Sequence, residues 1–66
     1  MTITINGEIT EQINSVSARE LLQERCGNQN KGVAIAKNGA ILKRDRWDEP
    51  LVDGDEIEII IASQGG

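Results

Sequence analysis

The sequence has 66 residues, of which 38% are hydrophobic and 27% charged, a composition typical of one small soluble globular domain and unlike that of a disordered segment. Eleven acidic residues outnumber seven basic ones, and the net charge of -4 disfavours binding to nucleic acid or to an anionic membrane. The chain has no His, one cysteine and no long apolar run, which excludes a Ser-His-Asp triad, a Cys/His zinc site, an internal disulfide and a transmembrane helix. We therefore expect a cytoplasmic protein that other enzymes act on.

The first residues predict a β-hairpin. Ile3 and Ile5 alternate with threonines, as expected of a strand with one buried face. Asn6-Gly7 follows, and both residue types tolerate the positive φ angles that a two-residue hairpin turn requires. A second strand resumes at Ile9.

The next segment predicts a helix of nine residues. Its apolar residues recur at helical spacing: Ala18, Leu21, Leu22 and Cys26. Ser17 and Glu20 have the spacing of a capping box at its start, and Gly27 is a suitable terminating residue. A helix this short is not stable alone in water, so its apolar face must pack on a sheet. We interpret Cys26 as a small apolar residue of that face, and not as a reactive thiol, because only Arg25 is a nearby cation.

The second half of the chain predicts a further hairpin and a polar connection. Residues 33–37 form a strand, Asn38-Gly39 repeats the hairpin turn, and residues 40–42 return. Residues 43–49 predict a loop or a short helical turn, in which Trp47 packs near Leu42 and Leu51.

The last strand, residues 56–61, is the most β-prone segment of the chain. The order β-β-α-β-β-β predicts an α+β fold of the ubiquitin-like β-grasp type, with a mixed sheet and one main helix on one face. The final strand should lie parallel to the first and beside it. We assign residues 1–61 to this domain and residues 62–66 to a flexible C-terminal tail that ends in Gly-Gly.

Strand alternation divides the side chains between two faces of the sheet. The face toward the helix is predicted to hold six isoleucines: Ile3, Ile5, Ile35, Ile57, Ile59 and Ile61. The open face is predicted to hold five smaller or more exposed residues: Thr2, Thr4, Ala34, Ala36 and Ile60.

These features in this order resemble the ubiquitin-like sulfur carriers. The resemblance spans the whole chain and rests on the opening hairpin, the Leu21-Leu22 helix, the strand with Asn38-Gly39, Trp47, the turn Asp53-Gly54-Asp55 and the ending Gly65-Gly66. It implies that the chain is a protein co-substrate and not an enzyme. The short length and the single aromatic residue favour carriers of thiamine biosynthesis over carriers for molybdopterin synthase.

The resemblance also implies the chemistry. A partner adenylyltransferase would use ATP and Mg to adenylate the carboxylate of Gly66, and a sulfurtransferase or cysteine desulfurase would supply the sulfur that converts it to a thiocarboxylate. The sulfur would then pass to the forming thiazole in a thiazole synthase. Gly65 and Gly66 lack Cβ atoms and can enter a narrow channel. The chain itself is expected to bind no cofactor or metal.

By the same resemblance, Ile60, Ala36 and Ala34 form the surface that docks on the activating enzyme. Nearby carboxylates are expected to steer a basic partner: Asp53, Asp55, Glu56 and Glu58. Three alternatives remain at this point: a molybdopterin-synthase carrier, a protein modifier that forms isopeptide bonds with lysines, and an interaction module whose diglycine has no function.

Overall fold

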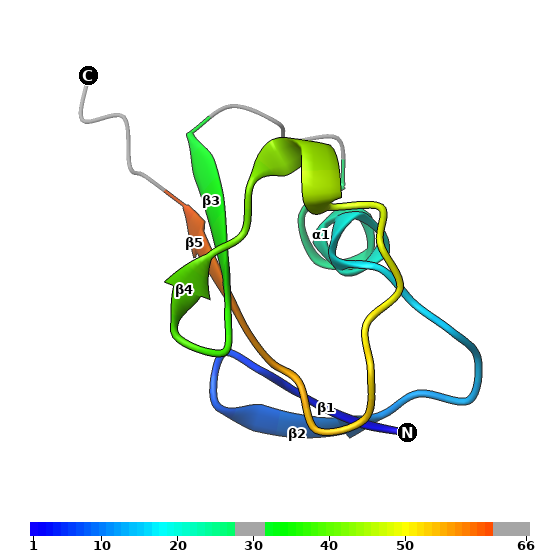
Figure 1. The fold of residues 1–66 in the computed structure, drawn as a ribbon. Coiled ribbons are helices and arrows are strands. Elements are labelled where there is room, and N and C mark those ends of the chain that lie inside the picture. The colour runs from blue at the N-terminus through cyan, green and yellow to red at the C-terminus, as the bar shows by residue number, and fades with distance from the viewer. Residues whose placement is uncertain (28–31, 62–66) are drawn as a thin grey trace.

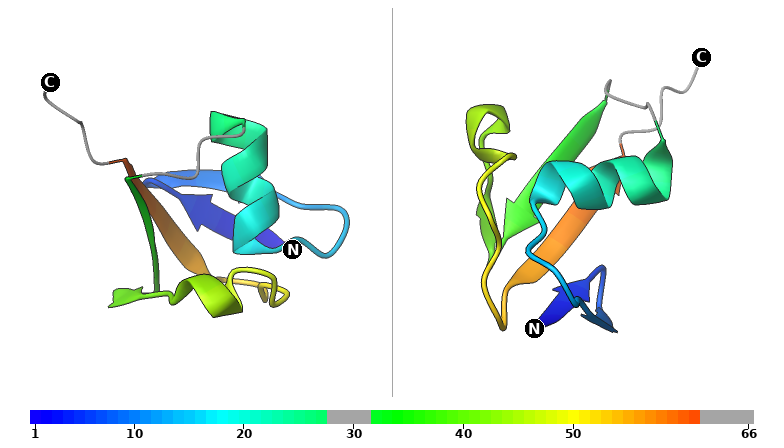
Figure 2. Two further views of the ribbon diagram at one scale, coloured as in Figure 1. Left: turned by 90° about the horizontal axis from the view of Figure 1, so that it is seen from above. Right: turned by 90° about the vertical axis from the view of Figure 1, so that its right-hand side faces the viewer.

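The computed structural model describes residues 1–27 and 32–61. It contains one five-stranded sheet of strand order β2-β1-β5-β3-β4, with helix α1 across one face (Figures 1 and 2). The elements in chain order are β1 (Thr2–Ile5), β2 (Glu8–Glu11), α1 (Ala18–Cys26), β3 (Val33–Lys37), β4 (Ala40–Ile41), the 3-10 helix η1 (Arg44–Arg46) and β5 (Glu56–Ile61). The predicted α+β class and element order are confirmed.

Two tight turns set the register of the hairpins. In the β1–β2 turn Asn6 and Gly7 have φ angles of 50° and 80°, and in the β3–β4 turn Asn38 and Gly39 have φ angles of 52° and 86°. Positive φ at both central residues defines a type I′ turn, whose twist matches that of the flanking strands. Both predicted Asn-Gly turns are therefore confirmed.

Strand β5 is central and holds the two hairpins together. It lies parallel to β1, where Thr4 pairs with Glu56, and antiparallel to β3, where Ala34 pairs with Ile60. The predicted parallel pairing of the first and last strands is thus confirmed. Each turn asparagine also contacts β5: Oδ1 of Asn38 accepts a bond from the Glu56 N–H, and Oδ1 of Asn6 accepts one from the Ile59 N–H, both at 2.8 Å.

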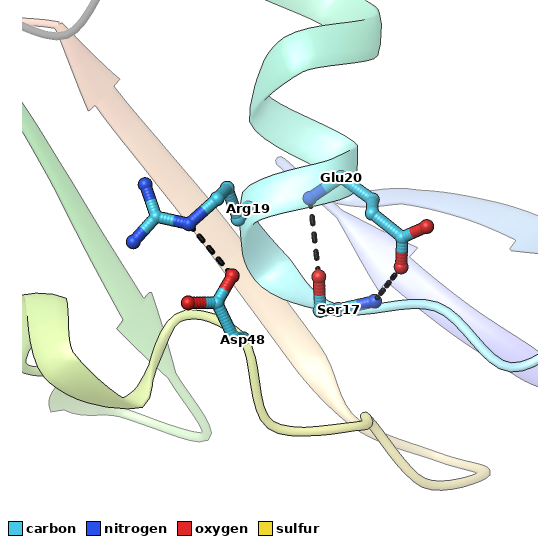
Figure 3. Close-up of polar contacts among 4 residues, drawn as sticks. All are labelled: Ser17, Arg19, Glu20 and Asp48. Carbon is cyan, nitrogen blue, oxygen red and sulfur yellow. Dashed lines mark hydrogen bonds and ion pairs between the residues drawn. The ribbon is translucent and has the colours of Figure 1, made fainter.

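Helix α1 begins at the capping box that the sequence predicts (Figure 3). The Glu20 N–H donates to Oγ of Ser17 at 3.2 Å, and the Ser17 N–H donates to the Glu20 carboxylate at 2.9 Å. At the other end Gly27 has a φ of 66°, and its N–H donates to the Gln23 carbonyl at 2.9 Å. These caps satisfy backbone groups that the helix itself leaves unpaired.

The segment that contains η1 is fastened to the start of the helix. Nε of Arg19 contacts Oδ1 of Asp48 at 2.7 Å (Figure 3), and the Arg19 guanidinium lies 5.5 Å from the Trp47 ring centroid. The Trp47 indole N–H donates to the Leu42 carbonyl at 3.0 Å. Trp47, Leu42 and Leu51 are all buried in the core, as predicted.

The core lies between the sheet and α1. Its largest fully buried side chains are Ile3, Ile5, Leu21, Leu22, Ile35 and Ile57. Ile59 is buried with them, but the prediction that Ile61 packs there is wrong, since 47% of Ile61 is exposed. Ile61 ends β5 beside Val33, and no described strand is paired with it on the other side.

Candidate functional site

The open face of the sheet carries a contiguous apolar patch. Cross-strand partners lie on the same face, so the pairs Ala34–Ile60 and Ala36–Ile41 bring four apolar side chains together. Ile41 is 69% exposed and Ile60 is 47% exposed. We call Ala34, Ala36, Ile41 and Ile60 the apolar patch.

The predicted residues Ile60, Ala36 and Ala34 are thus adjacent on one surface. Sequence reasoning missed Ile41, although a signal for it was present. A two-residue hairpin turn at Asn38-Gly39 places residue 41 opposite residue 36, which assigns Ile41 to the face of Ala36.

Two carboxylates lie beside the apolar patch. Glu58 pairs with Ala36, and Glu56 precedes it on the same face of β5. Both line a concavity of about 600 Å³ together with residues of β1, β3 and the two tight turns: Thr4, Asn6, Gly7, Ala36, Gly39, Ile57 and Ile59. Among the described residues neither glutamate takes part in a salt bridge. The face therefore combines apolar contact area with negative charge, which suits an apolar and basic partner surface.

The predicted steering role of Asp55 is not supported by its position. Only 5% of this residue is exposed. One carboxylate oxygen accepts from Nδ2 of Asn38 at 3.0 Å, and the other accepts from the Val52 N–H at 2.9 Å. Asp55 is a structural residue at the foot of β5. Asp53 is exposed, but its Oδ1 accepts from the Thr2 N–H at 2.6 Å. This bond joins the turn before β5, in which Asp53 lies, to β1.

The remaining predicted sites fall outside the part of the chain that the structure describes. Gly65, Gly66 and the tail 62–66 lie beyond its last residue, and the side chain of Cys26 is not described. Within residues 1–27 and 32–61, no three or more acidic or Cys side chains gather as a metal site would require. No helix in these ranges has the length and apolar content needed to cross a bilayer.

Comparison with known proteins identifies the family. Residues 3–66 match the model of the ThiS family. The sulfur carrier protein ThiS of Thermus thermophilus is 37% identical over 65 residues, covering 97% of this chain and 98% of that protein.

Solved structures agree. The crystal structure of the thiamine biosynthesis protein ThiS from Geobacter metallireducens superposes with a TM-score of 0.77 at 30% identity, and both chains are covered completely. An NMR structure of a thiamine biosynthesis protein from the same organism gives the same TM-score and identity, with 88% of that chain covered. These matches are to proteins of thiamine biosynthesis, as the sequence predicts. The chain therefore belongs to the ThiS family, a family of sulfur carriers for thiamine biosynthesis.

Proposed function

We propose that this chain carries sulfur for thiamine biosynthesis as a thiocarboxylate on Gly66. A partner adenylyltransferase activates the Gly66 carboxylate with ATP and Mg, so that AMP becomes the leaving group. The persulfide sulfur of a sulfurtransferase or cysteine desulfurase then attacks the acyl carbon and displaces AMP, and a thiol reduces the resulting acyl disulfide to the thiocarboxylate, becoming a disulfide itself. A thiazole synthase takes the sulfur from the carrier. The carrier supplies the reacting carboxylate, and its partners supply the catalytic side chains.

The observation that carries this proposal is the position of the apolar patch on the strand that leads to Gly66. Ile60 belongs to β5, which ends at Ile61, five positions before Gly66 in the sequence. Five extended residues span at most roughly 17 Å. A partner that docks on the patch would therefore hold its active site within that reach of the end of β5.

Glu56 and Glu58 add charge to this surface. Both side chains are exposed on the open face, and neither forms a salt bridge with a described residue. A basic partner can therefore approach them without first breaking an existing ion pair. Their contribution should be mainly to the association rate and should weaken as salt screens the field.

The first test is chemical. The chain is incubated with ATP, Mg, a sulfide source and extract of its native cells, and the C-terminal peptide is then analysed by mass spectrometry. Replacement of oxygen by sulfur adds about 16 Da, the same increment as a methionine sulfoxide at Met1, so the mass must be localised. An increment on the peptide that contains Gly65-Gly66 supports the proposal. If the C-terminus stays an ordinary carboxylate, and if deletion of Gly65-Gly66 leaves the function of the protein in its cells intact, the chain is better described as an interaction module.

The second test concerns docking and uses Ile60→Asp. A buried, unpaired carboxylate at the centre of the interface should reduce carrier-dependent ATP–pyrophosphate exchange by roughly tenfold or more. Ile13→Asp is the matched control, because Ile13 is 98% exposed and lies in the loop after β2, away from the patch. Equal activity of the two variants would overturn the docking assignment.

A further inference from the structure

Strand β5 runs past the end of its parallel neighbour. Strand β1 ends at Ile5, which pairs with Ile57, and the chain then reverses at Asn6-Gly7. On the other side β3 stays paired with β5 as far as Ile61. In Figure 2 (right) β5 accordingly continues beyond the arrowhead of β1. We call the side of Ile59–Ile61 that faces away from β3 the open half-edge.

The hydrogen bonds show which backbone groups point to this side. The carbonyls of Asp55 and Ile57 accept from Thr4 and Asn6 of the β1 segment, whereas Glu56 bonds with Asn38 on the β3 side. Because bonding direction alternates along a strand, the backbone groups of Ile59 and Ile61 also point away from β3.

Only the first of these groups has a partner among the described residues. The Ile59 N–H donates to Oδ1 of Asn6 at 2.8 Å, so a side chain replaces the backbone carbonyl that β1 no longer supplies. Beyond that point no described residue bonds to the Ile59 carbonyl or the Ile61 N–H on this side. The β1–β5 ladder thus stops with the Ile59 carbonyl and the Ile61 N–H bonded to none of the described residues.

The other sheet edges are less suited to strand addition. β2 begins and ends with the exposed acidic residues Glu8 and Glu11, and β4 has only two residues. Charge and shortness are the usual protections of an edge. The open half-edge carries no charged side chain, since it consists of three isoleucines, of which Ile60 and Ile61 are 47% exposed.

The turn beside the half-edge also leaves room. A Cβ built on Gly7 would meet no atom within 4 Å apart from its chain neighbours, so the space directly around this glycine is open.

We propose that an extended segment of the adenylating partner adds to the open half-edge as a short strand and bonds to the Ile59 carbonyl and the Ile61 N–H. This inference rests on the proposed function. The partner is the expected occupant because the half-edge is continuous with the chain that leads to Gly66 and adjoins the apolar patch at Ile60. Backbone bonds at this point orient the chain just before the reacting carboxylate, whatever the tail sequence.

The test is amide hydrogen exchange measured by NMR, with the enzyme isolated as the activity that catalyses carrier-dependent ATP–pyrophosphate exchange. In the free carrier the Ile61 amide should exchange at least tenfold faster than the Ile59 amide, which is bonded to Asn6. In the complex Ile61 should slow by at least tenfold, while the Ile13 amide in the loop after β2 should not change. An Ile61 amide that keeps its free rate in a saturated complex overturns the proposal. Protection that rises with carrier concentration alone would identify a second copy as the occupant and overturn it too.

A pair of variants gives an independent readout. Ile61→Pro removes the N–H, and Ile61→Ala keeps it while shortening the side chain. The Tm values of the two variants should agree to within about 3 °C, because the Ile61 N–H donates to no described residue and its removal breaks no bond among them. The KM of the enzyme for the carrier should be roughly five- to tenfold higher for the proline variant than for the alanine variant. This ratio corresponds to the loss of about one hydrogen bond. Equal KM values contradict strand addition. If no enzyme adenylates the wild-type chain, the proposed function itself fails, which is a different result.

Discussion

Single polar residues in this chain act as connectors between strands. Asn6 extends the pairing of β5 past the end of β1, and Asn38 holds β5 from the opposite side. Asp55 links Asn38 to the loop before β5, since its carboxylate accepts from the Asn38 side-chain amide and from the Val52 N–H. In such a small sheet, one buried carboxylate satisfies donors from two segments that would otherwise lack partners.

Asp55→Ala should therefore destabilise the fold by roughly 2 kcal/mol, because it leaves the Asn38 amide and the Val52 N–H without their acceptor. Urea unfolding followed by Trp47 fluorescence measures the change. Asp45→Ala is the control, since Asp45 is exposed within η1. Equal unfolding midpoints for the two variants would show that the Asp55 bonds do not contribute to stability.

At the scale of elements, the sequence signals for helix α1 agree with its observed bounds. Helix α1 has only nine residues and an exposed outer face that is polar, so its stability comes from its caps and from packing on the sheet. The capping box supplies two of the backbone partners at its first turn. Loss of either partner leaves a donor unpaired at the edge of the core.

Ser17→Ala should cost about 1 kcal/mol, the usual value for an N-cap. The expected result is a lower Tm in a thermal scan, with no change in the helix content at 25 °C. Ser15→Ala serves as the comparison, because Ser15 is exposed and precedes the helix without capping it. A Ser17 variant as stable as the Ser15 variant would mean that water replaces the cap at no cost.

At the scale of the whole molecule, the described elements pack around one hydrophobic core between the sheet and α1. A domain of this size has a total stability of roughly 3 to 10 kcal/mol. The core side chains come from β1, β3, β5, α1 and the segment around Trp47, so none of these can be lost without opening the core. The apolar patch lies on the opposite face of the sheet from this core.

Ile35→Ala should remove roughly 2 to 5 kcal/mol, a large part of the total, because Ile35 is completely buried and its loss leaves a cavity. Ile9→Ala, at a site that is 73% exposed, should change the stability by less than about 0.5 kcal/mol. Denaturant titrations of both variants check the difference. A small effect at Ile35 would show that the core closes around the gap.

Much of this protein was predictable from its sequence, because the signals are local. The two Asn-Gly pairs determine the hairpin turns, and Ser17 with Glu20 determines the start of α1. Alternation correctly assigned Ile57 and Ile59 to the core and Ile60 to the open face. The ordered set of motifs also led to the right family.

Only the tertiary structure decided the rest, since burial depends on what lies beside a residue and not on its own segment. Alternation gave Ile61 the same side as Ile59, yet Ile61 is half exposed because β1 ends before reaching it. Asp55 occurs in a polar turn, yet it is buried because Asn38 comes from another hairpin to meet it. The apolar patch, likewise, includes Ile60 only because β5 returns from a distant part of the chain and pairs Ile60 with Ala34.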